Sequence, residues 1–148
     1  MKGQGGLPAA IATLDPRGTV DKSRARAQGN LMIWTLLQVA FGGAIGSILR
    51  FATVTAIGAP LATFLVNVAG SFAMGGLFVL LAGRTQLSPL LMTGILGGFT
   101  TFSAFSLDAL KLWQSGQTLQ ALLYVLASVI LSILAVALGA ALARGAFA

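Results

Sequence analysis

Residues 94–106 read GILGGFTTFSAFS and lie inside an uncharged segment, 85–107, that is long and apolar enough to cross a membrane. Two adjacent glycines, Gly97 and Gly98, weaken a helix by about 1 kcal/mol each relative to alanine. Two threonines follow, and their hydroxyls compete with the helix for backbone hydrogen-bond partners. We therefore expect a membrane-spanning helix that is broken near its middle. In the alternative interpretation, Gly94 and Gly98 form a small-residue packing face.

Three further uncharged stretches surround this one, at 31–49, 51–83 and 112–143. Spanning a hydrocarbon core takes about 20 apolar residues, and each stretch is long enough. Pro60 suits the first turn of a helix, and a turn is expected at Ser115-Gly116. We predict four transmembrane helices, near 31–50, 60–82, 88–111 and 118–143. A soluble helical bundle would need polar outer faces, and the sequence has none.

The composition excludes several classes of protein. Of the 148 residues, 57% are hydrophobic and 8% are charged, whereas a soluble domain averages about 25% charged residues. The chain has no Cys, His or Glu, which excludes a Cys/His metal site and a histidine-dependent serine hydrolase. A four-helix, proton-coupled exporter needs a carboxylate within the membrane, and Asp108 lies near a predicted helix end. A structural subunit without ion flux is the remaining alternative.

Basic residues are distributed unevenly along the chain. Five of the nine lie in the first 30 residues: Lys2, Arg17, Lys22, Arg24 and Arg26. The other four stand near the ends of the apolar stretches: Arg50, Arg84, Lys111 and Arg144. Nucleic-acid binding needs clustered basic residues on one face, so we expect no nucleic-acid partner. Pro8 and Pro16 disfavour an early helix. We predict a disordered basic tail over 1–30 and a transmembrane domain over 31–148.

The tail also bears on orientation, because four spans place both termini on one side. Arg84 and Arg144 then lie on the side of the termini, and Arg50 and Lys111 lie on the other. The Lys/Arg bias sets which side faces the cytoplasm, so the spans alone favour neither orientation. Adding the five basic residues of the tail gives seven (five plus two) against two. The tail is therefore predicted to hold the termini in the cytoplasm.

Polar side chains within the spans are few, and they are costly unless they face a partner or water. Phe102 and Phe105 share a helical face, with Ser103 and Ser106 beside them. Aromatic rings have a positive edge. Ring edges and hydroxyl donors together form a surface that attracts an anion without a formal charge. The alternative is ordinary core packing.

Two other spans carry polar residues at helical spacing. Asn67 shares one face with Gly70 and Ser71, and its amide is either interhelical glue, at about 1 kcal/mol, or a donor to a pore. The last span has hydroxyls at i, i+4 and i+8, which predicts a polar track formed by Tyr124, Ser128 and Ser132.

A helix break within a membrane frees carbonyl oxygens that can hold a small cation, and a half-helix N-terminus that favours an anion. Arg50 is expected at a membrane end, because an Arg at mid-depth costs about 3 kcal/mol. There it either draws anions to a vestibule or anchors the helix. Trp34 and Trp113 are predicted to be interfacial anchors.

Three motifs together resemble the Fluc fluoride channels, the CrcB family: GGAIGSILR at 42–50, TFLVNVAGSF at 63–72 and GGFTTFSAFS at 97–106. The resemblance covers about 31–143. It implies an all-α membrane protein with four transmembrane helices and a break in helix three, packed as an antiparallel dimer. It also implies a fluoride-selective ion channel, not an enzyme, that passively exports fluoride from the cytoplasm. Two pores would run along a dual-topology homodimer interface, in contact with membrane lipid, in the cell inner membrane or plasma membrane.

The resemblance further implies roles for single residues. Asn67 would be the amide donor at the pore, and Phe102 and Phe105 the pore-lining rings. The pore would also include the hydroxyls of Ser103, Ser106, Tyr124, Ser128 and Ser132. Arg50 would be the basic residue at the vestibule. The main-chain oxygens of Gly97 and Thr100, doubled across the dimer axis, would hold a central structural Na⁺. The sequence departs from the family pattern in its long basic tail, which argues against dual topology, and in Ala104, where the motif often has Thr.

Overall fold

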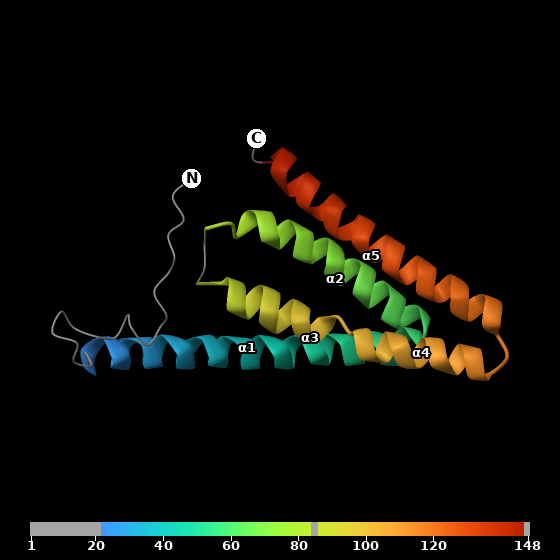
Figure 1. Cartoon of the computed structure of the whole chain (residues 1–148), viewed down its shortest axis with the longest axis horizontal. Helices are drawn as coiled ribbons and strands as arrows, with labels where there is room; N and C mark the ends of the chain where they lie inside the picture. The colour runs from blue at the N-terminus through green and yellow to red at the C-terminus, as the bar shows by residue number, and fades with distance from the viewer. Residues whose placement is uncertain (1–21, 84–85, 147–148) are drawn as a thin grey trace. The chain divides into compact units, whose positions relative to one another are not determined.

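The computed structural model describes residues 22–83 and 86–146, and every regular element in these two ranges is a helix. Figure 1 shows their order along the chain: α1 (Lys22–Ile57), α2 (Leu61–Leu80), the π-helix η1 (Pro89–Leu96), the short α3 (Gly97–Phe99), α4 (Phe102–Gln114) and α5 (Thr118–Ala146). Four segments are long and apolar enough to cross a membrane: Arg26–Ile57, Leu61–Leu80, Pro89–Gln114 and Thr118–Ala146. The predicted four spans are therefore confirmed. So is the turn at Ser115-Gly116, where Gly116 has a φ of 79°.

Helix α1 extends past both predicted ends. It begins at Lys22, within the range predicted to be a disordered tail, in a run of Lys, Arg, Ala and Gln that favours helix. Residues 1–21 of that predicted tail lie outside the described residues. At the other end α1 continues to Ile57 and stops before Gly58, whose φ is 87°. The prediction that this helix ends at Arg50 is therefore wrong.

The chain divides into two units, Met1–Leu36 and Leu37–Ala148. In the described part of the first unit, the first turns of α1 expose large apolar side chains such as Met32 and Trp34. In the second unit, exposed Leu, Ile and Phe side chains occur on every span. Apolar exposure on this scale marks a surface that contacts something other than water, and spans of this length and composition are typical of helices that cross a membrane.

Within the second unit, α2 packs against α5, and the two helices lie side by side (Figure 1). Glycine makes this contact close. A Cβ added to Gly75 would collide with the Val136 carbonyl, and one added to Gly139 would collide with the Phe72 carbonyl. Small residues permit such backbone contact between membrane helices, where dispersion and packing replace the hydrophobic effect.

A second glycine contact joins α1 to the third span. A Cβ on Gly46 would collide with the Ile95 carbonyl, and a Cβ on Gly98 would meet the backbone of Gly43. Gly42 and Gly94 face each other in the same way. The packing role considered for Gly94 and Gly98 is therefore present, and the helix is still intact at these glycines.

The third span is interrupted one turn further on, at Thr100 and Thr101. Thr100 has φ −78° and ψ 156°, and Thr101 has φ −153° and ψ 123°, so both are extended. The Thr101 hydroxyl accepts a hydrogen bond from the Ala104 amide at 3.2 Å and thereby caps α4. The predicted break is confirmed. The threonines form it, because an N-cap residue needs non-helical backbone angles.

Candidate functional site

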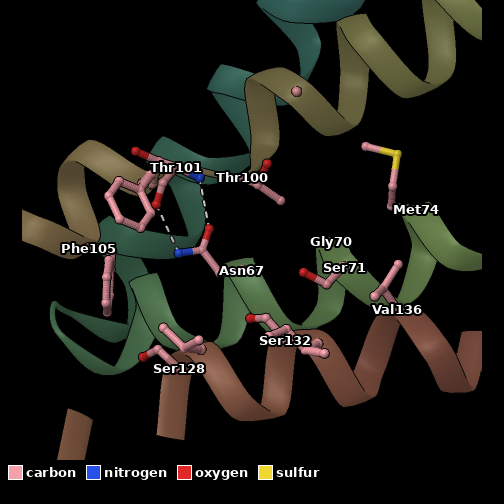
Figure 2. A pocket seen from close by; sticks show the side chains of 14 residues that line it. Asn67, Gly70, Ser71, Met74, Thr100, Thr101, Phe105, Ser128, Ser132 and Val136 are labelled. Carbon is pink, nitrogen blue, oxygen red and sulfur yellow. Dashed lines mark hydrogen bonds between the residues drawn. The ribbon is translucent and has the colours of Figure 1, made fainter. Parts of the chain in front are cut away.

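The side chain of Asn67, on α2, is bound to the backbone of the break. Its Nδ2 donates to the Thr101 carbonyl at 2.9 Å, and its Oδ1 accepts from the Thr101 amide at 2.8 Å (Figure 2). Asn67 thus links two helices, which is one of the two roles that the sequence allowed. An Asn amide has two N–H donors, so one donor is left over after the bond to Thr101.

These side-chain bonds release main-chain oxygens from the helix. In a continuous α-helix the Thr101 amide would donate to the Gly97 carbonyl, and the Ala104 amide would donate to the Thr100 carbonyl. Here the Thr101 amide donates to Asn67 and the Ala104 amide donates to the Thr101 hydroxyl. The carbonyls of Gly97 and Thr100 have therefore lost their helical donors. They are the two oxygens predicted to hold Na⁺.

Carbonyl oxygens are the ligands that the break offers to a cation. The part of the chain that the structure describes contains no group of three or more His, Cys, Asp or Glu that could hold a metal ion. Unwound backbone in membrane transporters coordinates Na⁺ through carbonyl oxygens. The donor set at Gly97 and Thr100 fits an alkali cation, and one chain supplies only part of a coordination shell.

Arg50 lies at the break and not at a helix end. Its side chain is half-buried, and its Nε donates to the Gly98 carbonyl at 3.1 Å. The helix end expected at Arg50 is absent, since α1 continues to Ile57, and the expected position at a membrane end stays a prediction. The predicted vestibule role of Arg50 stays a prediction.

A cavity of about 630 Å³ lies between α2, the break, α4 and α5 (Figure 2). Its lining consists of Asn67, Gly70, Ser71, Met74, Gly97, Thr100, Thr101, Phe102, Phe105, Ser128, Val129, Ser132, Ile133 and Val136. None of these residues is charged. The cavity therefore combines hydroxyl, amide and aromatic groups from three spans with an apolar wall.

The hydroxyls on α5 are buried without partners. Among the described residues, nothing forms a hydrogen bond with the hydroxyl oxygens of Tyr124, Ser128 and Ser132. Helical Ser often bonds to the carbonyl four residues earlier, as Ser106 does with Phe102 at 2.9 Å. Buried polar atoms without partners are rare and costly. These three hydroxyls thus have unused hydrogen-bonding capacity, and Ser128 and Ser132 both line the cavity.

Three aromatic rings lie one after another near these hydroxyls: Phe102, Phe105 and Tyr124. The ring centroids of Phe102 and Phe105 are 5.3 Å apart, and those of Phe105 and Tyr124 are 5.4 Å apart. Phe105 is buried, whereas Phe102 is 76% exposed although it lines the cavity. The cavity is thus bounded on one side by a ring that this single chain leaves uncovered.

Three predicted pore residues do not line the cavity: Ser103, Ser106 and Tyr124. Ser103 and Ser106 are exposed. The Ser103 hydroxyl is 3.3 Å from that of Thr101, and the Ser106 hydroxyl bonds to its own helix. Within the described chain, both serines support the local structure of α4.

Comparison with known proteins identifies the family of the chain. The model of the family described as CrcB-like protein, Camphor Resistance (CrcB), matches residues 37–140. The chain belongs to the CrcB family. The matched region contains the break, Arg50 and the whole cavity lining.

Curated relatives of this CrcB-family chain carry one name, Fluoride-specific ion channel FluC. The protein of Paracoccus denitrificans is 52% identical, over 77% of this chain and 98% of its own length. That of Cereibacter sphaeroides is 50% identical, again over 77% and 98%. That of Chelativorans sp. is 52% identical, over 76% and 98%. The four spans and this membership make the chain a multi-pass membrane protein.

One polar pair in this CrcB-family chain was missed by sequence reasoning. Thr63 donates to Asp108 Oδ2 at 2.7 Å, and the two residues are 1% and 7% exposed. Asp108 was placed near a helix end, but α4 continues to Gln114. The sequence did offer one indication that Asp108 is buried. It lies three residues after Phe105 and therefore on the same face of the helix. Asp108 also lines a second cavity of about 320 Å³, together with Lys111, Ser115 and Gln117.

Proposed function

We propose that this protein is a fluoride-selective ion channel through which fluoride leaves the cytoplasm passively. The observation that carries the proposal is an uncharged cavity flanked by buried hydroxyls without partners. The names of the curated relatives support fluoride as the ion. Ion passage by this route requires no catalytic residue, so the protein is a channel and not an enzyme.

Uncharged donors suit the transport of a small anion. A pore must replace part of the hydration shell of the ion, and it must also let the ion leave. A Lys or Arg in the path would hold fluoride tightly. The Asn67 amide, the Ser128 and Ser132 hydroxyls and the ring edges of Phe102 and Phe105 offer weaker contacts that an ion can exchange in sequence. The Tyr124 hydroxyl extends the series along α5.

We propose further that two copies pack antiparallel as a dual-topology homodimer with two pores along the interface. The support is that one chain leaves the cavity incomplete, with Phe102 76% exposed. A second copy would cover this ring. It would also bring another pair of Gly97 and Thr100 carbonyls to the break, which would complete the shell of a central structural Na⁺. A cation there would offset the cost of desolvating an anion nearby, since Coulomb energies grow at low dielectric.

The proposed location is the cell inner membrane or plasma membrane, with lipid around the dimer and fluoride as the only ligand besides Na⁺. The proposal includes no nucleic-acid partner. Arg50 would contribute positive potential near the vestibule, and Ser103 and Ser106 would act through the local structure of α4. A structural subunit, the rival, predicts no ion flux from the purified chain alone.

Fluoride efflux from liposomes that contain the purified protein, followed with a fluoride electrode, tests the proposal. We expect efflux well above that of empty liposomes and no matching chloride efflux. Asn67→Ala and Phe102→Ile should suppress it. Ser47→Ala, on an exposed position of α1 outside the cavity, is the control and should leave efflux unchanged. Efflux no faster than from empty liposomes would support the structural subunit instead.

A further inference from the structure

The side chain of Arg50 reaches the break because α1 lies against the third span at glycines. Gly46 contacts the backbone of Ile95 and Phe99, and Gly98 contacts the backbone of Gly43. Residue 50 is one helical turn beyond residue 46, on the same face of α1. Close backbone contact at Gly46 thus aims the next residue on that face at the end of α3.

The Gly98 carbonyl needs the donor that Arg50 supplies. In an uninterrupted α-helix its donor would be the amide of Phe102. The extended conformations of Thr100 and Thr101 separate these groups, and Phe102 instead begins α4. The last carbonyls of a helix lack intrahelical donors, and a basic side chain there both hydrogen-bonds them and interacts favourably with the helix dipole.

We propose that Arg50 is a positioning residue that caps the Gly98 carbonyl and holds the break in its open shape. The break is then held by side chains from two different helices. Arg50 of α1 binds the carbonyl of Gly98, two residues before Thr100, and Asn67 of α2 binds the backbone of Thr101. The Arg50 bond occupies the Gly98 carbonyl, which lies next to Gly97 in the chain. That this keeps the Gly98 oxygen out of the cation shell rests on the proposed Na⁺ site.

Two substitutions separate the hydrogen bond from the charge. In Arg50→Gln an N–H donor stands at the same number of bonds from Cα as the Arg Nε, and the charge is gone. In Arg50→Lys the charge is kept, a methylene stands where the Nε donor was, and the ammonium donors lie one bond further from Cα, so a cap at the Gly98 carbonyl would need a different side-chain path. A capping role therefore predicts that Gln preserves the break better than Lys. A purely electrostatic vestibule role predicts the reverse order.

Amide hydrogen exchange of the purified full-length protein measures the break directly and does not depend on fluoride flux. In Arg50→Lys we expect exchange in peptides covering 97–104 to be at least about tenfold faster, which corresponds to ~1.4 kcal/mol. In Arg50→Gln it should stay near wild type. Peptides covering 121–139 of α5 report on global stability, and they should be unchanged in both variants.

Two results would overturn the proposal. One is wild-type exchange at 97–104 in both variants. The other is fast exchange with Gln and wild-type exchange with Lys. If Arg50→Lys does not give a monodisperse protein, Arg50→Gln decides alone: protected amides support the cap, and unprotected amides refute it. Fluoride efflux of the same preparations is measured in parallel. Loss of the cap would appear as fast amide exchange at 97–104, whereas failure of the channel assignment would appear as no fluoride efflux from the wild-type protein.

Discussion

Replacing Ser128 by Ala separates a transport role from a packing role. Ser128 is 4% exposed and lines the cavity of about 630 Å³. Its hydroxyl has no hydrogen-bond partner in the described ranges 22–83 and 86–146. The substitution therefore removes no internal hydrogen bond. It removes a buried polar group whose lack of a partner costs roughly 1–3 kcal/mol, so we expect the thermal unfolding midpoint to stay the same or to rise.

The effect on transport should have the opposite sign. A hydrogen bond to a charged group contributes about 1.5–3 kcal/mol. Losing one such contact while fluoride crosses the cavity corresponds to a roughly ten- to hundredfold lower rate. The assay is the initial rate of fluoride efflux from liposomes, with unfolding measured on the same preparation and Ser47→Ala as the matched control. Wild-type efflux, or slow efflux accompanied by a lower unfolding midpoint, would refute the reasoning.

Three other changes have defined outcomes. Gly46→Ala should destabilise the fold by about 1–3 kcal/mol, because the added methyl group would overpack against backbone. Gly43→Ala, whose added Cβ meets no atom within 4 Å, is the control and should be tolerated. Size-exclusion profiles and thermal unfolding midpoints of the two variants measure the difference. Thr63→Val leaves the buried carboxylate of Asp108 without its donor and should lower the free energy of unfolding by about 1.5–3 kcal/mol. The control Thr53→Val loses only a hydrogen bond within its own helix. Equal thermal unfolding midpoints of the two variants would contradict this expectation. Deleting residues 1–30 should bring the two orientations closer to equal abundance, because five of the basic residues that favour a cytoplasmic N-terminus are removed. The accessibility of a C-terminal tag from each side of the membrane measures the ratio, and an unchanged ratio would count against the tail.

Local sequence features were enough to predict the spans and the break. Uncharged runs of membrane length set the four helices, and the pair Thr100-Thr101 changes backbone preference within a few residues. The length of α1 was not predictable in the same way. Arg50 indicated a helix end only while no partner for it was known. Its partner, the Gly98 carbonyl, is 48 residues away in the sequence.

The candidate site was predictable for side chains on regular helices and less so around the break. The spacing of Tyr124, Ser128 and Ser132 predicted one buried stripe, because α5 is continuous from Thr118 to Ala146. Ser103 and Ser106 were assigned from their position beside Phe102 and Phe105 and from the family motif, and the start of α4 at Phe102 leaves both exposed. The pairing of Asp108 with Thr63 was missed because the two residues are 45 positions apart in the sequence.

The contact between α2 and α5 has a bearing on how the passage resists widening. At Gly75 and Gly139 main chain touches main chain, with no side chain in between. Val136, whose carbonyl meets Gly75, also lines the cavity. At this contact no change of rotamer can move α2 away from α5, so a wider cavity on this side requires the two backbones to separate. Rejection of a bulkier halide on this side would then depend on helix packing, while side chains such as Met74 set the width elsewhere in the lining.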